Sequence, residues 1–124
     1  MIGGRVLDAS ALVAFASQSS VYAAALVWTA VEESIVLVLP ATAVATAWSH
    51  LPEKQHPVLE VLLRLPVTVV DDLDASRARA VGQLGGEQRD AHAVACALDR
   101  GWPLVTADAS RYAGFDGLDL EQLP

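Results

Sequence analysis

The sequence is poor in cysteine and in basic residues. A single cysteine, Cys96, excludes a disulfide framework and is typical of a reducing, cytoplasmic setting. Eight lysines and arginines stand against fifteen acidic residues, which gives a formal net charge of −7. This balance argues against a nucleic-acid-binding protein that neutralises many phosphates. It does not argue against an enzyme whose acidic pocket reaches a phosphate backbone through metal ions.

Long hydrophobic runs are also missing. The longest apolar stretch, residues 35–48, contains Pro40 and is shorter than the roughly 18 residues that a membrane-spanning helix needs. The first residues lack the basic-then-apolar pattern of a secretory signal peptide. We therefore expect a cytoplasmic protein with no membrane association.

Two common catalytic motifs are absent as well. The glycine pairs at residues 3–4 and 85–86 are not followed by the Lys-Ser or Lys-Thr of a phosphate-binding loop. No serine or cysteine lies in a nucleophile elbow. These absences exclude the phosphate-loop and elbow classes of enzyme.

What the sequence does contain is an alternation of apolar strands and helical patterns, in a chain that is 53% hydrophobic. Strands are predicted at residues 6–7, 35–39, 67–70, 103–106 and, as a shorter fifth one, within 117–123. Helices are predicted at residues 10–16, 20–33, 43–51, 57–65, 73–84 and 88–100. This alternation predicts a three-layer α/β/α fold, with helices on both faces of a central parallel sheet of four to five strands. The length fits a single domain over residues 1–124.

Three aspartates, Asp8, Asp90 and Asp108, lie directly after a strand or at the start of a helix. Each alone is explained by helix capping. Together they would meet, because ligands of parallel α/β sheets bind outside the carboxyl ends of the strands. Each carboxylate pair about 5 Å apart would cost roughly 3 kcal/mol at an effective dielectric constant of about 20. A hard cation such as Mg²⁺ or Mn²⁺ would offset this repulsion, since it prefers carboxylate oxygens.

The order and local sequence of these segments resemble the PIN-domain family, the fold of the VapC-type toxins of toxin–antitoxin pairs. Residues 6–12 resemble the family's first motif. Residues 90–98 and 101–108 resemble its last two motifs, and residues 117–121 its final strand. The resemblance covers nearly the whole chain and supports a PIN-like fold.

The resemblance implies a divalent-metal-dependent endoribonuclease that hydrolyses RNA phosphodiesters with Mg²⁺ or Mn²⁺. Asp8, Asp90 and Asp108 would hold the metal and perform the catalysis. Ser10 and Thr106 would support them by hydrogen bonds, because outer groups orient metal ligands. The other reading of these two hydroxyls is that they satisfy nearby backbone groups. The resemblance also implies an RNA substrate, a cognate antitoxin protein and a homodimer.

One position departs from the family pattern. The family usually supplies a further glutamate in the helix after the second strand, and Thr46 stands there in this sequence. A threonine hydroxyl is neutral and at best supports a metal-bound water. The alternative reading is therefore a catalytically impaired PIN-fold protein that acts as a protein- or RNA-binding module.

Two further groups of polar residues could contribute chemistry. His92 and Cys96 are four residues apart on one predicted helix, a spacing compatible with zinc, but two more ligands are required. We expect Cys96 to be buried and inert and His92 to be partly exposed. We expect Asp71 and Asp72 to form a turn and a helix cap, since aspartate is common at such sites.

The helices around Trp28 and Trp48 are strongly apolar. We expect Trp28 and Tyr22 to lie in the core, and Trp48 to do so together with Val44 and Leu51. The two helices carry more apolar residues than one sheet face needs. A dimer interface or an antitoxin groove is therefore predicted on them, with an antitoxin helix docking by apolar anchors. An arginine of that helix could reach the acidic pocket and stand in for the metal charge.

Overall fold

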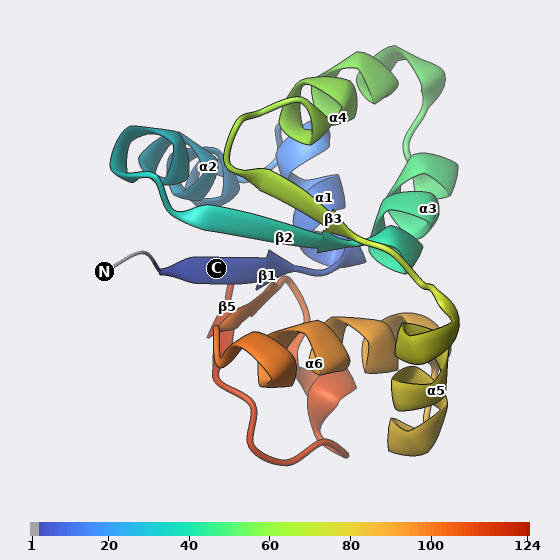
Figure 1. Cartoon of the computed structure of the whole chain (residues 1–124). Coiled ribbons are helices and arrows are strands. Elements are labelled where there is room, and N and C mark those ends of the chain that lie inside the picture. The colour runs from blue at the N-terminus through green and yellow to red at the C-terminus, as the bar shows by residue number, and fades with distance from the viewer. Residues whose placement is uncertain (1–2) are drawn as a thin grey trace.

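A single five-stranded sheet organises the computed structural model, which describes residues 3–124 (Figure 1). Its strands are β1 (Gly4–Leu7), β2 (Val36–Pro40), β3 (Thr68–Asp71), β4 (Leu104–Thr106) and β5 (Leu120–Gln122). They lie in the order β3-β2-β1-β4-β5, and every neighbouring pair is parallel. The predicted parallel α/β sheet is confirmed with five strands.

Helices cover both faces of the sheet, as Figure 1 shows. The helices are α1 (Ala9–Ala16), α2 (Val21–Glu33), α3 (Ala41–His50), α4 (His56–Leu63), α5 (Ala75–Leu84) and α6 (Gln88–Arg100), with 3₁₀ turns η1 (Glu53–Gln55) and η2 (Ala109–Tyr112). Helices α1 to α4 lie on one side, and α5 and α6 on the other. The predicted three-layer arrangement is therefore confirmed.

The three inner strands β1, β2 and β4 are largely buried, whereas the edge strands β3 and β5 are partly exposed. Leu7 and Leu37 pack with the helices of the α1–α4 layer. Val6 and Val38, one residue away in each strand, pack with α6 on the other side. Successive side chains of a strand point to opposite faces, so the two layers share one sheet but form separate cores.

Helix boundaries follow local capping. Ser20 caps α2 and its side chain accepts a hydrogen bond from the backbone N–H of Ala23. Helix α5 begins at Ala75, two residues later than predicted, because the side chain of Asp74 caps it. Gly101 ends α6 in the left-handed conformation with φ 67°.

Helix α2 turns its large aromatic residues outward, so their predicted place in the core is wrong. Trp28 is 70% exposed and Tyr22 is 62% exposed. The helix instead buries Ala23, Val27 and Ala30. Within residues 3–124 no single helix is long and apolar enough to cross a membrane; α1 and α2 pass such a test only as a pair bent by 96°.

Trp48 of α3 also lies nearer the surface than predicted. It is 37% exposed and stacks on the ring of His56, with the ring centroids 4.1 Å apart. Leu51 is buried and Val44 packs against the core, as expected. The exposed aromatic residues of α2 and α3 leave apolar surface available for a partner.

Gly4 in β1 leaves room for the ring of Trp102. A Cβ atom at Gly4 would overlap Cε3 and Cζ3 of that indole. We expect Gly4→Ala to lower the free energy of unfolding by about 1–3 kcal/mol, as overpacking does. Urea unfolding would measure this, with Gly3→Ala as the control because its added Cβ would meet no atom within 4 Å. Equal unfolding midpoints for the two variants would contradict the prediction.

Candidate functional site

A cavity of about 430 Å³ opens where the carboxyl ends of β1 and β4 meet α1, α3 and α6. Two of the predicted aspartates, Asp8 and Asp90, line it. Ser10 and Thr46 line it as well. Its position agrees with the rule that ligands of parallel sheets bind beyond the carboxyl ends of the strands.

Asp8 is held by three donors and is almost fully buried. As the N-cap of α1, its Oδ1 accepts the backbone N–H of Ala11 at 2.9 Å. The same Oδ1 accepts the hydroxyl of Ser10 at 2.6 Å, and Oδ2 accepts the hydroxyl of Tyr112 at 2.7 Å. Asp8 therefore both caps α1 and lines the cavity.

Tyr112 serves as a firm proton donor to Asp8. Its own burial, and then the negative charge of Asp8, raise the pKa of Tyr112 far above its ordinary value. The phenol therefore stays protonated at any physiological pH. This hydrogen bond joins η2 to the end of β1 and fixes the orientation of the carboxylate.

Ser10 and Thr106 link Asp8 to the end of β4. The Ser10 hydroxyl accepts the backbone N–H of Ala107 at 2.8 Å and lies 3.2 Å from Thr106 Oγ1. Thr106 Oγ1 accepts the backbone N–H of Asp108 at 3.0 Å. The two hydroxyls therefore contact both the carboxylate and the backbone, so neither of the two readings excludes the other.

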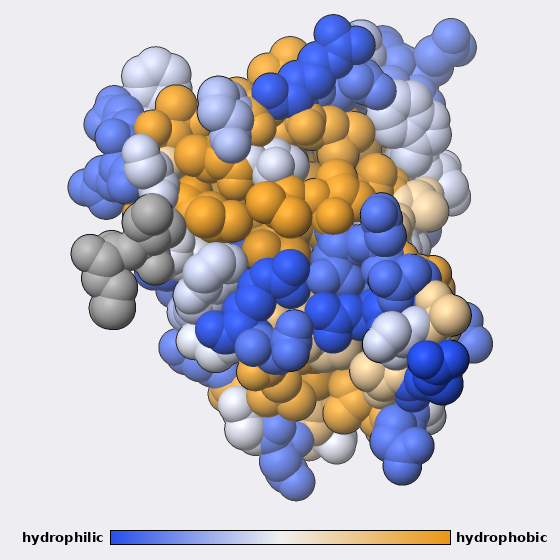
Figure 2. All heavy atoms as spheres, in the orientation of Figure 1, coloured by the Kyte–Doolittle hydropathy of each residue, from blue (hydrophilic) through white to orange (hydrophobic). Residues whose placement is uncertain are grey.

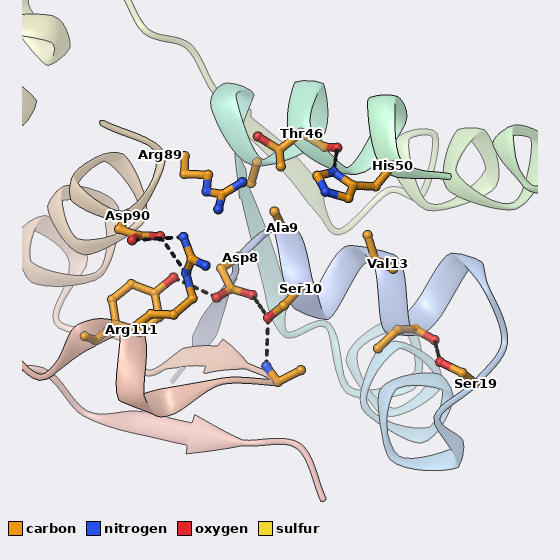
Figure 3. Close-up of a pocket in the computed structure, with 14 residues that line it drawn as sticks. Asp8, Ala9, Ser10, Val13, Ser19, Thr46, His50, Arg89, Asp90 and Arg111 are labelled. Carbon is orange, nitrogen blue, oxygen red and sulfur yellow. Dashed lines mark hydrogen bonds and ion pairs between the residues drawn. The ribbon is translucent and has the colours of Figure 1, made fainter. Parts of the chain in front are cut away.

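Asp90, in the first turn of α6, carries an ion pair that the sequence did not suggest. Arg111 Nε donates to Asp90 Oδ1 at 3.1 Å, and Arg111 Nη2 donates to Asp90 Oδ2 at 3.2 Å. Arg111 Nη2 also lies 3.2 Å from Glu87 Oε2. The hydrogen bond that Arg111 donates to Asp90 is the main reason why the pKa of Arg111 is raised. Figure 3 shows the guanidinium of Arg111 beside Asp90, on the side of Asp8.

Asp108 lies apart from these two carboxylates. It is exposed, does not line the cavity, and accepts a hydrogen bond from the hydroxyl of Ser110. Over residues 3–124, Asp8, Asp90 and Asp108 do not bring three ligand oxygens within 4.8 Å of one another. The structure thus brings two of the three predicted metal ligands into one cavity. Asp108 is outside the cavity, although the residue before it, Ala107, lines the cavity.

The wall opposite Asp8 comes from α3. Thr46 lines the cavity, and its hydroxyl donates to the carbonyl oxygen of Thr42 at 2.8 Å. His50, one turn later, has Nδ1 2.9 Å from the carbonyl oxygen of Thr46. Arg89 of α6 also lines the cavity, and its Nε lies 2.8 Å from Glu87 Oε1. The wall therefore adds no carboxylate to the site.

The chain partly neutralises its own acidic site. Two carboxylates, Asp8 and Asp90, share the cavity with two guanidiniums, those of Arg89 and Arg111. The repulsion expected between clustered acids is relieved by Arg111 and by the donors on Asp8. The oxygens of Asp8, Asp90 and Ser10 still form a donor set suited to Mg²⁺ or Mn²⁺, which bind through one or two carboxylates and retain waters.

A second polar network lies at the end of β3, outside this cavity. Asp71 is buried, so the predicted turn and cap is wrong for it; its Oδ1 lies 2.9 Å from His92 Nε2. Arg77 and Arg100 also donate to this carboxylate. His92 is fully buried, so its expected partial exposure is wrong. The ring can be buried because both of its nitrogens have partners: Nδ1 lies 2.9 Å from Thr42 Oγ1, and Nε2 contacts Asp71.

Cys96 belongs to the same network and is buried, as predicted. Burial, together with the negative charge of Asp71, raises the pKa of the Cys96 thiol to about 12. The thiol is therefore protonated and unreactive near neutral pH.

Sequence reasoning missed three residues of the first site, Arg89, Arg111 and Tyr112. The first precedes Asp90 directly, and the other two follow Asp108 by three and four residues. Neighbourhood to the motif aspartates was the available signal. That signal does not say where the side chains point. The side chains of Arg111 and Tyr112 reach the site only because the η2 turn directs them toward Asp90 and Asp8.

No protein-family model and no curated protein matches the sequence. Solved structures do match. One is a chain in the crystal structure of VapBC2 from Rickettsia felis bound to a DNA fragment from their promoter, with TM-score 0.75 and 14% identity over 98% of this chain and 99% of that one. Another is PAE2754 from Pyrobaculum aerophilum, with TM-score 0.62 and 20% identity over 95% of this chain and 83% of that one. The chain therefore has the PIN-like three-layer fold that its sequence motifs resemble.

Proposed function

We propose that this chain is an endoribonuclease of the toxin–antitoxin type that cleaves RNA phosphodiesters with Mg²⁺ or Mn²⁺. One observation carries the proposal. Asp8 and Asp90, separated by most of the chain, line the same cavity at the carboxyl ends of the strands. The shared fold with a chain of VapBC2 supports the toxin–antitoxin setting.

In this proposal Asp8 and Asp90 hold the ion, and Asp108 contributes after a change of side-chain conformation. When bound, the ion supplies Lewis-acid stabilisation of the phosphate and lowers the pKa of water at the site. Ser10 and Tyr112 keep Asp8 in one orientation through their hydrogen bonds. Thr106 supports the same arrangement through Ser10 and the backbone of Asp108.

Arg89 and Arg111 are the groups suited to bind the substrate. Guanidinium groups recognise phosphate oxygens by paired hydrogen bonds. Both side chains line the cavity, and Arg89 has a partly exposed side chain. They supply local positive charge in a protein whose overall charge of −7 does not favour RNA.

The test is cleavage of single-stranded RNA by the purified chain. We expect cleavage with Mn²⁺ or Mg²⁺ that stops when EDTA is added, and a loss of at least about 100-fold in the Asp8→Asn variant, since removing one electrostatic group at a reacting centre commonly costs that much. Thr46→Glu should raise the rate, because it returns a carboxylate to the α3 wall. Absence of cleavage in both the natural chain and Thr46→Glu would favour the binding-module alternative.

We further propose that this protein binds an antitoxin and forms a homodimer. Exposed apolar side chains gather on α2, at Val21, Tyr22 and Trp28. A second group lies on α4 and the edge strand β3, where Figure 2 shows apolar atoms in the upper half of the face. Such patches are typical of interaction surfaces.

Size-exclusion chromatography with light scattering tests the dimer. We expect twice the chain mass of 13.1 kDa at high protein concentration. A Trp28→Ser variant distinguishes the two surfaces, because it alters α2 and leaves α4 and β3 unchanged. A monomer at every concentration would exclude the homodimer.

A further inference from the structure

Three potential metal ligands lie together at the end of β3, in a part of the molecule that the proposed nuclease site does not use. They are Asp71, His92 and Cys96, and one ligand atom of each lies within 4.8 Å of the other two. His92 and Cys96 are completely buried and Asp71 is 8% exposed. None of the three lines the cavity of Asp8 and Asp90.

We propose that Asp71, His92 and Cys96 form a zinc site, with a carboxylate oxygen, the imidazole Nε2 and the thiolate Sγ as protein ligands and a water as the fourth. Zinc combines ligands of these three kinds in tetrahedral sites. The thiolate makes the site selective for zinc over Mg²⁺ or Mn²⁺, which favour oxygen. The proposal does not depend on the nuclease function.

The spacing of the ligand atoms suits a tetrahedral ion after small adjustments. Zinc bonds of about 2.0–2.3 Å require ligand atoms about 3.3–3.8 Å apart. His92 Nε2 and Asp71 Oδ1 are now 2.9 Å apart and need only to separate slightly. His92 and Cys96 lie one helical turn apart on the same helix, so both reach the same point.

Neighbouring side chains already orient the ligands. His92 Nδ1 lies 2.9 Å from Thr42 Oγ1, which leaves Nε2 directed at Asp71. Metal-bound histidines are usually fixed by such a bond on their other nitrogen, and metal-bound carboxylates are hydrogen-bonded in turn. Arg100 fulfils the second role through Asp71 Oδ2, and Arg77 does so through both Oδ2 and Oδ1.

An acidic cleft outside β3 offers a path for a cation. The cleft has a volume of about 500 Å³ and reaches Asp71. Its lining includes four carboxylates, those of Asp71, Asp72, Asp74 and Asp99, against the two guanidiniums of Arg77 and Arg100. Zinc would replace the Cys96 proton, because a coordinating thiol is deprotonated outright. The proton of the neutral His92 ring would move from Nε2 to Nδ1, where it donates to Thr42 Oγ1. The exchange adds one positive charge and reduces the excess of negative charge in the cleft.

Cobalt titration of the full chain tests the site, because Co²⁺ substitutes for zinc and reports thiolate coordination by a charge-transfer band in the near ultraviolet. After treatment with EDTA and dialysis, we expect one equivalent of Co²⁺ to produce that band and Zn²⁺ to abolish it. Cys96→Ser should lose the band and bind Zn²⁺ at least about tenfold more weakly in competition with a chromophoric chelator. Asp8→Asn should keep both properties.

Three results would overturn the proposal. The first is the absence of a charge-transfer band in the natural chain at saturating Co²⁺, a measurement that needs no variant. The second is equal zinc affinity in the natural chain and in a folded Cys96→Ser variant. The third is binding that Asp8→Asn abolishes, which would place the ion in the other cavity. RNA cleavage is a separate readout, so failure of either proposal leaves the other intact.

Discussion

Replacing Arg111 with glutamine is expected to strengthen Mn²⁺ binding by about ten- to a hundredfold. In the natural chain Arg111 donates two hydrogen bonds to Asp90, and a cation must compete with them. Hydrogen bonds to charged groups contribute about 1.5–3 kcal/mol, and each 1.36 kcal/mol corresponds to a tenfold change in affinity. Isothermal titration calorimetry with Mn²⁺ would measure the difference.

Arg89→Gln is the matched control for this prediction. Arg89 lines the same cavity, but it pairs with Glu87 and not with either aspartate of the site. Its removal should change Mn²⁺ affinity much less. The idea that Arg111 acts as a built-in counter-charge for Asp90 fails if both variants bind Mn²⁺ like the natural chain.

The Arg111→Gln variant should also depend more on bound metal for its stability. Without Arg111, the carboxylate of Asp90 keeps its partial burial and loses its cation. Thermal unfolding midpoints with and without Mn²⁺ should therefore differ more in Arg111→Gln than in the natural chain. In the free chain, Arg111 would thus supply the positive charge that we expected an antitoxin arginine to supply.

Asp71→Asn is expected to lower the free energy of unfolding by about 3–5 kcal/mol near neutral pH. The substitution removes the negative charge that Arg77, Arg100 and His92 share and leaves them one neutral amide oxygen in place of two carboxylate oxygens. Leaving several buried or half-buried donors without a charged partner costs more than losing one surface pair. Urea unfolding at about pH 7 would measure the loss.

The cost should shrink as the pH falls. Burial alone would raise the pKa of Asp71, but hydrogen bonds from His92 and Arg77 and the charge of Arg77 lower it to about 2, from 3.8. A folded pKa below the unfolded one means that ionised Asp71 stabilises the fold above about pH 4. That contribution, about 2 kcal/mol, is lost as the pH falls toward 2.

The difference in stability between the natural chain and Asp71→Asn should therefore narrow by about 2 kcal/mol between about pH 4 and pH 2. Asp72→Asn is the control, because Asp72 is adjacent and exposed. It should unfold like the natural chain across this range. A gap between the natural chain and Asp71→Asn that stays constant with pH would show that the lost packing, and not the charge, accounts for the destabilisation.

Much of the fold could be predicted from the sequence because the signals are local. Continuous apolar runs marked strands buried on both faces, and capping residues such as Ser20 marked helix starts. Asp8 directly follows β1, and Asp90 lies in the first turn of α6; the two line one cavity at the carboxyl ends of the strands. Asp108 follows β4 and was expected there by the same rule, but it does not line the cavity. The pairing of these two aspartates was therefore accessible without coordinates.

The orientation of α2 was not accessible in this way. The helix is apolar on all sides, so its periodicity did not select the buried face. Packing against the sheet selected the small residues Ala23 and Ala30, and Trp28 was left in solvent. Which face of a uniformly apolar helix is buried depends on the assembled core and is not encoded in residue spacing.

The sequence by itself determined a parallel α/β protein of the PIN-like type and placed Asp8 and Asp90 at one edge of its sheet. Only the tertiary structure decided how these charges are balanced. Arg111 reaches Asp90 from η2, and Tyr112 reaches Asp8 across 104 residues of sequence. Asp71, His92 and Cys96 likewise meet because β3 ends beside α6. Pairwise electrostatics depends on distances through space, and a sequence supplies these only where regular elements fix them.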